Sequence, residues 1–91
     1  MRCVLPGKKI ATRADFHAEL ARRLRLPDHF GRNLDALWDA LTAELPGPVE
    51  IVWRQAAFSR RALGAKEHDR LVGLLLDAAA ERDDLRVVIE S

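Results

Sequence analysis

The chain has 91 residues, of which 48% are hydrophobic and 32% are charged, and its formal net charge is +1. This length supports one small domain with a modest core, and the mixed charges exclude a disordered tail. The single cysteine, Cys3, excludes an internal disulfide, and no apolar run approaches the roughly 20 residues of a membrane span. Because the first residues also lack a signal-peptide pattern, we expect a cytoplasmic protein that does not bind membranes.

The first quarter of the chain predicts a strand followed by a helix. Residues Arg2–Leu5 are rich in apolar side chains and precede a proline–glycine pair, which is typical of a short strand and a turn. Thr12 and Asp15 have the spacing of a capping box, which begins a helix. Apolar residues then recur at helical spacing, at Phe16, Leu20 and Leu24. We expect this helix to end before Pro27.

A second helix is predicted in the middle of the chain. Gly31 suits a backbone turn that other residues resist, and Asn33 is a good N-cap. One face of the helix is apolar, at Leu34, Leu37, Leu41 and Leu45. Another face is polar, at Asp35, Asp39 and Thr42. Trp38 lies at the border between the two faces, so the helix has a core side and a presented side.

The second half of the chain predicts two more strands and a long helix. After a break at residues 46–48, residues 49–53 are typical of a strand in which Trp53 packs inward. Residues 56–63 fit either a short helix or a turn. A strong apolar stripe predicts a last helix, at Leu71, Leu74, Leu75, Ala78 and Ala79. Residues 85–89 then predict a third, mostly buried strand.

Strands that alternate with helices favour parallel pairing through crossovers. We therefore expect a small α/β fold in two layers, with residues 1–91 forming a single domain around a three-stranded parallel sheet. Cys3, within the first strand, is expected to be a buried small hydrophobe. The three histidines and Cys3 lack metal-ligand spacing, so we expect neither a metal site nor a cofactor.

Charge is unevenly distributed along the chain. Up to Leu26, seven basic residues face two acidic ones, whereas from Pro27 to Glu50 one basic residue faces five acidic ones. Asp35 and Asp39 stand four residues apart, and such a pair of like charges costs an isolated helix roughly 0.2–0.5 kcal/mol. This acidic face fits a binding surface, a merely solvated face, or the acid–base pair of an enzyme. One small exposed helix does not supply the cleft that the last alternative needs.

Two runs of sequence resemble the barstar family, whose members are intracellular inhibitors of a secreted, guanyl-specific bacterial ribonuclease. LPDHFGRNLDALWDALT spans residues 26–42, and VEIVWRQ spans residues 49–55. The resemblance covers nearly the whole chain, and its specific part is the first run. It implies three parallel strands with helices packed against them, and a role in bacterial immunity that involves no catalysis.

The resemblance also implies roles for individual residues. Asp39 matches the anion that occupies the phosphate site of the nuclease, and Asp35 matches a second anion at the rim. The loop that meets the guanine side of the enzyme matches Phe30, Gly31 and Asn33. Trp38 matches a contact residue at the edge of the interface, and Thr42 matches a peripheral polar contact.

Three positions depart from the family pattern. His29 stands where the family carries a tyrosine that packs over the catalytic histidine of the nuclease. Glu44 replaces an aromatic interface residue, and Asp77 matches a longer glutamate. The family is also acidic overall, unlike this chain. These departures favour a target related to the best-known ribonuclease but different from it.

The sequence therefore predicts an inhibitor that binds a guanyl-specific extracellular ribonuclease in a 1:1 complex and binds no nucleic acid. Two alternatives stay open. The same fold could act against a different toxin or protein partner. The basic first helix could also bind RNA, although it lacks the interleaved exposed aromatic residues that such a site uses.

Overall fold

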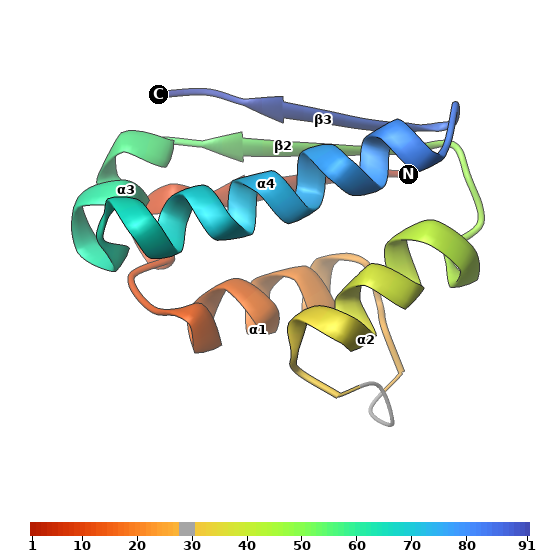
Figure 1. Cartoon of the computed structure of the whole chain (residues 1–91), viewed down its shortest axis with the longest axis horizontal. Helices are drawn as coiled ribbons and strands as arrows, with labels where there is room; N and C mark the ends of the chain where they lie inside the picture. Colours follow the sequence, from red (N-terminus) through yellow and green to blue (C-terminus); the bar gives the residue numbers. More distant parts are fainter. Residues whose placement is uncertain (28–30) are drawn as a thin grey trace.

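A three-stranded parallel sheet forms one layer of the protein, as the computed structural model of residues 1–27 and 31–91 shows (Figure 1). Its strands, in spatial order, are β1 (Arg2–Pro6), β2 (Val49–Arg54) and β3 (Leu85–Ile89). The helices are α1 (Arg13–Arg23), α2 (Leu34–Asp39), α3 (Ala56–Leu63) and α4 (Ala65–Glu81), with a 3-10 turn η1 (Gly7–Lys9) and a π-helical segment η2 (Ala40–Glu44). This architecture confirms the predicted α/β class, the parallel pairing and the order of the elements.

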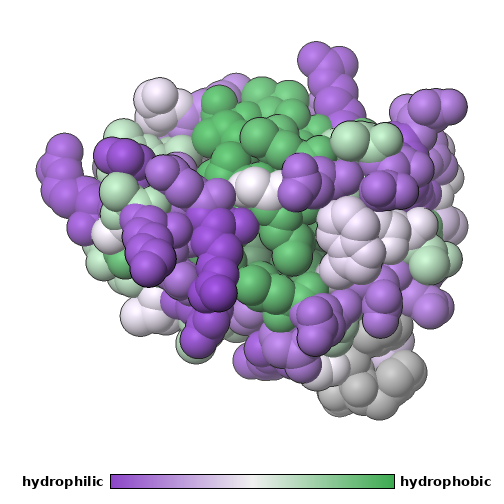
Figure 2. Space-filling view, viewed as in Figure 1, coloured by the Kyte–Doolittle hydropathy of each residue, from purple (hydrophilic) through white to green (hydrophobic). Residues whose placement is uncertain are grey.

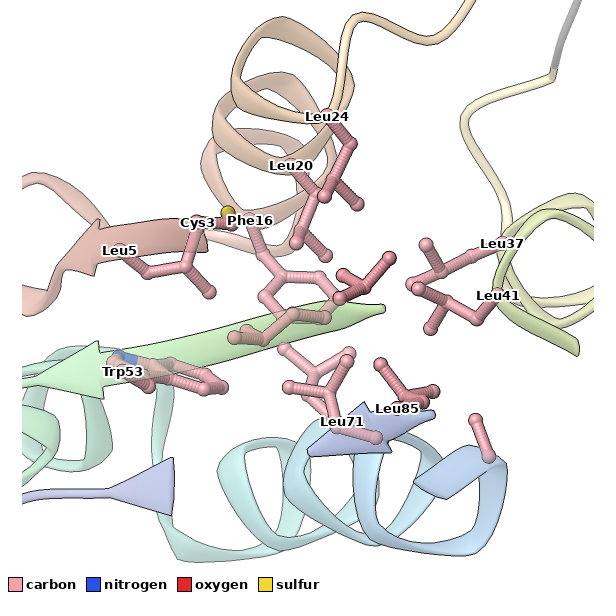
Figure 3. Close-up of a cluster of buried hydrophobic side chains, with 14 of the residues drawn as sticks. Cys3, Leu5, Phe16, Leu20, Leu24, Leu37, Leu41, Trp53, Leu71 and Leu85 are labelled. Atoms are coloured by element: carbon pink, nitrogen blue, oxygen red, sulfur yellow. The ribbon is translucent and has the colours of Figure 1, made fainter. Parts of the chain in front are cut away.

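The core takes alternate side chains from each strand. Leu5, Ile51 and Leu85 are buried together with leucines of the helices, and Trp53 lies fully buried beside Phe16 (Figure 3). Cys3 is buried as predicted, and this burial raises the pKa of its thiol to about 11.

The opposite face of the sheet carries ordered rows of residues across the three strands. Val4, Val52 and Val88 lie side by side in register and are not part of the core cluster. In the neighbouring row, Glu50 pairs with arginines on both flanking strands. β3 is therefore less buried than predicted: Leu85 is buried, but the residues that follow it are half-buried or exposed, because β3 is an edge strand.

The segment that the sequence left open is the helix α3, and a buried hydroxyl explains its position. Ser59 Oγ donates to the carbonyl of Gly7 at 2.7 Å and accepts from Trp53 Nε1 at 3.2 Å. A Cβ atom at Gly7 would collide with the backbone carbonyl oxygens of Arg54 and Gln55. Close backbone approach and this small polar network therefore join η1, β2 and α3, and neither leaves a signal in hydrophobic periodicity.

The start of α1 is confirmed in detail. Asp15 N–H donates to Thr12 Oγ1 at 3.0 Å, and Thr12 N–H donates to Asp15 Oδ2 at 3.1 Å, which completes the predicted capping box. The helix ends at Arg23, before Pro27 as expected.

His17 on α1 predicts a pH-dependent stability. The residue is 7% exposed, its ring packs edge-on against Phe16, and burial lowers the pKa of the imidazole. Because the unfolded chain then binds the proton more readily, the free energy of unfolding should fall as the pH drops below about 6.5. His17→Gln should flatten this fall in urea titrations between pH 7.5 and pH 5. An unchanged slope would show that another group titrates there.

Candidate functional site

Residues 34–44, which comprise α2 and η2, form what we call the acidic helix. Asn33 caps it as predicted, since its side-chain oxygen accepts from the Ala36 N–H at 2.8 Å. The inner side of the helix is fixed by burial of Leu37 and Leu41, which point into the core (Figure 3). Trp38 is half-buried and packs against the same core, as its border position predicts. Packing of this inner side against the core therefore keeps the outer side of the helix facing solvent.

The acidic helix changes from α to π geometry after Asp39, whereas the sequence predicts a uniform helix. Leu45 N–H donates to the carbonyl of Ala40 at 2.9 Å, five residues earlier. Thr42 is half-buried, and its hydroxyl donates to the carbonyl of Trp38 at 2.7 Å. Hydroxyl contacts of this kind compete with the helical backbone and bend it. The Thr42 side chain is therefore less available than its place on the polar face predicts.

Three carboxylates of the acidic helix are exposed. Asp35, Asp39 and Glu44 form no ion pair with any residue in the described part of the chain. Several acidic side chains elsewhere do have partners, as in Glu19, which pairs with Arg22 and Arg23 at 2.8 and 2.9 Å. The carboxylates of this helix therefore have hydrogen-bonding capacity that these described side chains do not use.

The helix α4 packs against both α2 and η2, and it carries further exposed carboxylates. Asp77 and Glu81 of α4 are exposed, as is Asp83 in the turn after it, and within the described residues none of the three forms an ion pair. Glu81 and Asp83 were not singled out from the sequence. A signal was available, since acidic residues at the C-terminus of a helix oppose its dipole and are unfavourable for the helix itself. We call the six carboxylates the acidic surface: Asp35, Asp39, Glu44, Asp77, Glu81 and Asp83.

The loop before the acidic helix is described only in part. Gly31 is exposed. A Cβ atom at Gly31 would lie 2.7 Å from Nδ2 of the Asn33 cap, so a larger residue would crowd the start of the helix. His29 and Phe30, which the resemblance places in the same loop, lie outside the described residues.

One face of the molecule has an apolar area among hydrophilic side chains (Figure 2). In the orientation of Figure 1, an apolar area lies over α4 and the neighbouring strands and is bordered by hydrophilic side chains. Leu76 of α4 is 47% exposed and adjoins Asp77 in the sequence. Across residues 1–27 and 31–91, no cluster of three or more histidine, cysteine or carboxylate side chains could hold a metal ion. The helices described here are all too short or too polar to cross a bilayer.

Comparisons with known proteins agree with this arrangement. The family model Barstar, described as barnase inhibitor, matches residues 1–90. A Bacillus subtilis (strain 168) protein named "Putative ribonuclease inhibitor YrdF" is 32% identical over 90 residues, which cover 98% of this chain and 98% of that protein. Both matches run through the sheet, the acidic helix and α4, and on their strength the chain belongs to the barstar family of ribonuclease inhibitors.

Proposed function

We propose that this protein inhibits a secreted, guanyl-specific microbial ribonuclease in the cytoplasm, as a 1:1 complex in which the acidic helix blocks the active site. The observation that carries the proposal is the set of exposed carboxylates that form no ion pair with the described residues, on a helix whose inner side is buried in the core. The full proposed contact set is His29, Phe30, Gly31, Asn33, Asp35, Trp38, Asp39, Thr42, Glu44 and Asp77.

The physical basis is imitation of RNA phosphate. A ribonuclease that cleaves at guanosine must stabilise negative charge on a phosphate, so its site presents arginine, lysine and histidine donors. A carboxylate can accept several of these charge-assisted hydrogen bonds at once. Asp39 is proposed to occupy the phosphate position, with Asp35 at its rim. Because the helix is already ordered in the free protein, binding loses little conformational entropy there.

A second candidate is a barstar-like module that acts on a different toxin. The charged Glu44, in place of an aromatic residue, and the near-neutral net charge of the chain favour this alternative over the best-known target. Titrating the protein against purified guanyl-specific ribonucleases, with an unrelated ribonuclease as the control, separates the two. We expect stoichiometric loss of RNA cleavage only with the guanyl-specific enzymes. Loss with none of them would favour the alternative.

Association should depend on salt, although the whole molecule is near neutral. The acidic surface meets a basic active site, and exposed charges are screened beyond roughly 10 Å at 0.1 M ionic strength. We expect the association rate constant, measured by stopped-flow fluorescence, to fall between 50 and 500 mM NaCl. An association rate that does not change with salt would contradict electrostatic docking through this surface.

Glu81→Lys tests the part of the acidic surface that the structure added. The substitution replaces an anion with a cation at the C-terminus of α4, which should raise the free energy of unfolding by about 0.3–1 kcal/mol. It should also slow association with the ribonuclease, because a like charge then faces the basic site. Arg86→Glu, on the outer face of the sheet, is the control with the opposite charge change. If Glu81→Lys leaves the association rate constant unchanged, Glu81 lies outside the contact.

A further inference from the structure

The C-terminal end of the acidic helix needs hydrogen-bond donors that the helix cannot supply. The last carbonyl groups of any helix lack N–H partners within it. Here Leu45 N–H already bonds to the carbonyl of Ala40. The next bond of the π-helical pattern would run from residue 46 to the carbonyl of Leu41, but residue 46 is a proline and has no N–H. The carbonyl oxygens of Leu41 and Leu45 must therefore find donors elsewhere in the fold.

Arg82 supplies both donors. Its Nη1 donates to the carbonyl oxygen of Leu41 and to that of Leu45, each at 2.9 Å. The Arg82 side chain is only 13% exposed, although it lies in the turn between α4 and β3, some forty residues away in sequence. A cation at this position also interacts favourably with the negative, C-terminal end of the helix dipole.

Asp84 fixes the guanidinium in place. Arg82 Nε donates to Asp84 Oδ1 at 2.8 Å, and Nη2 donates to Oδ2 at 2.9 Å, a bidentate pair. The hydrogen bonds from Arg82 lower the pKa of the Asp84 carboxyl, and the Asp84 carbonyl accepts from Val49 N–H at 2.8 Å. A Cβ atom at Gly47 would collide with the Asp84 carboxylate. Arg82 and Asp84, which we call the arginine clamp, therefore join η2, the start of β2 and the turn before β3.

We infer that Arg82 is a positioning residue for inhibition: it fixes the π-helical end of the acidic helix and thereby the direction in which Asp39 and Glu44 are presented. This inference rests on the proposed function. Asn33 holds only the N-terminal end of the helix, and Asp39 stands directly before η2. The planar fork of an arginine can bond two carbonyls and a carboxylate together, whereas a lysine ammonium has no such geometry.

The first experiment uses the free protein and needs no ribonuclease. Arg82→Met keeps the aliphatic stem of the side chain. Arg86→Met is the control, because the Arg86 side chain is 76% exposed and its ion pair with Glu50 is long, at 3.7 Å. In Arg82→Met, amide hydrogen exchange of Leu45 should accelerate by about tenfold or more, since two hydrogen bonds to a charged donor are lost. Exchange of the Leu24 amide, bonded to Leu20 in α1, should change far less.

Equal acceleration at Leu45 and Leu24 would mean that Arg82 contributes only global stability, and this result would overturn the inference. No acceleration at Leu45 would overturn it as well. Arg82→Lys keeps the charge and serves as the second variant if Arg82→Met does not fold. It should still accelerate exchange at Leu45, because an ammonium group cannot reproduce the fork.

The second experiment measures coupling in the complex. Arg82→Met should raise the dissociation constant of the ribonuclease complex by about tenfold in the wild-type background, and far less in the Asp39→Ala background. Additive effects of the two substitutions would overturn the positioning role. A wild-type protein that inhibits no guanyl-specific ribonuclease would overturn the proposed function instead. The hydrogen-exchange comparison then still tests whether Arg82 fixes the end of the acidic helix in the free protein.

Discussion

Asp39→Ala is expected to abolish inhibition while leaving the fold intact. Asp39 is exposed, lies past the first turn of the helix and forms no ion pair with the described residues, so its removal costs the free protein little. Alanine is also the better helix former, by up to about 0.7 kcal/mol. In the complex, the substitution leaves the phosphate-binding cations of the enzyme without an anion, a loss of about 2–5 kcal/mol or more.

The measurement pairs a thermal melt with an inhibition titration at constant salt. Glu90→Ala is the matched control, since it also removes one negative charge and its pair with Arg54 is exposed on both sides. Glu90→Ala should change neither the melting temperature nor the inhibition appreciably. If Asp39→Ala unfolds the protein, Asp39 is structural. If it folds and inhibits normally, phosphate imitation through Asp39 is wrong.

Leu41→Ala, two residues further along the same helix, should lower stability while leaving inhibition by the folded protein intact. Leu41 is fully buried, and truncation of a buried leucine typically costs 2–5 kcal/mol through lost burial and the cavity left behind. Small domains have only about 5–15 kcal/mol of stability, so a large part of it should be lost.

Urea unfolding monitored by fluorescence measures this loss. Under conditions in which the variant is still mostly folded, its inhibition per folded molecule should stay close to that of the wild type, because Asp35 and Asp39 remain on the outer side. A loss of stability below about 1 kcal/mol would show that the site relaxes to fill the cavity. A loss of inhibition that exceeds the unfolded fraction would show that the inner side of the helix also sets the geometry of the outer side.

The sequence by itself determined those features that depend on neighbouring residues. The capping box at Thr12 and the N-cap at Asn33 are short-range hydrogen bonds, so their spacing is visible in the chain. The leucine stripe of the acidic helix and the alternation of strands with helices follow from periodicity and burial, which predicted the parallel α/β fold. Hydrophobic periodicity also predicted the exposed aspartates of the candidate site, because they lie on the side of the helix opposite its apolar stripe.

Only the tertiary structure decided the features that depend on residues far apart in the chain. The half-buried edge strand β3 depends on the order of the strands in the sheet, and α3 depends on the hydroxyl of Ser59 reaching Gly7. The carboxylates of α4 belong to the same region as the acidic helix because those helices pack together. The arginine clamp spans some forty residues, and hydrophobic periodicity carries no information about which distant side chain satisfies a free carbonyl group.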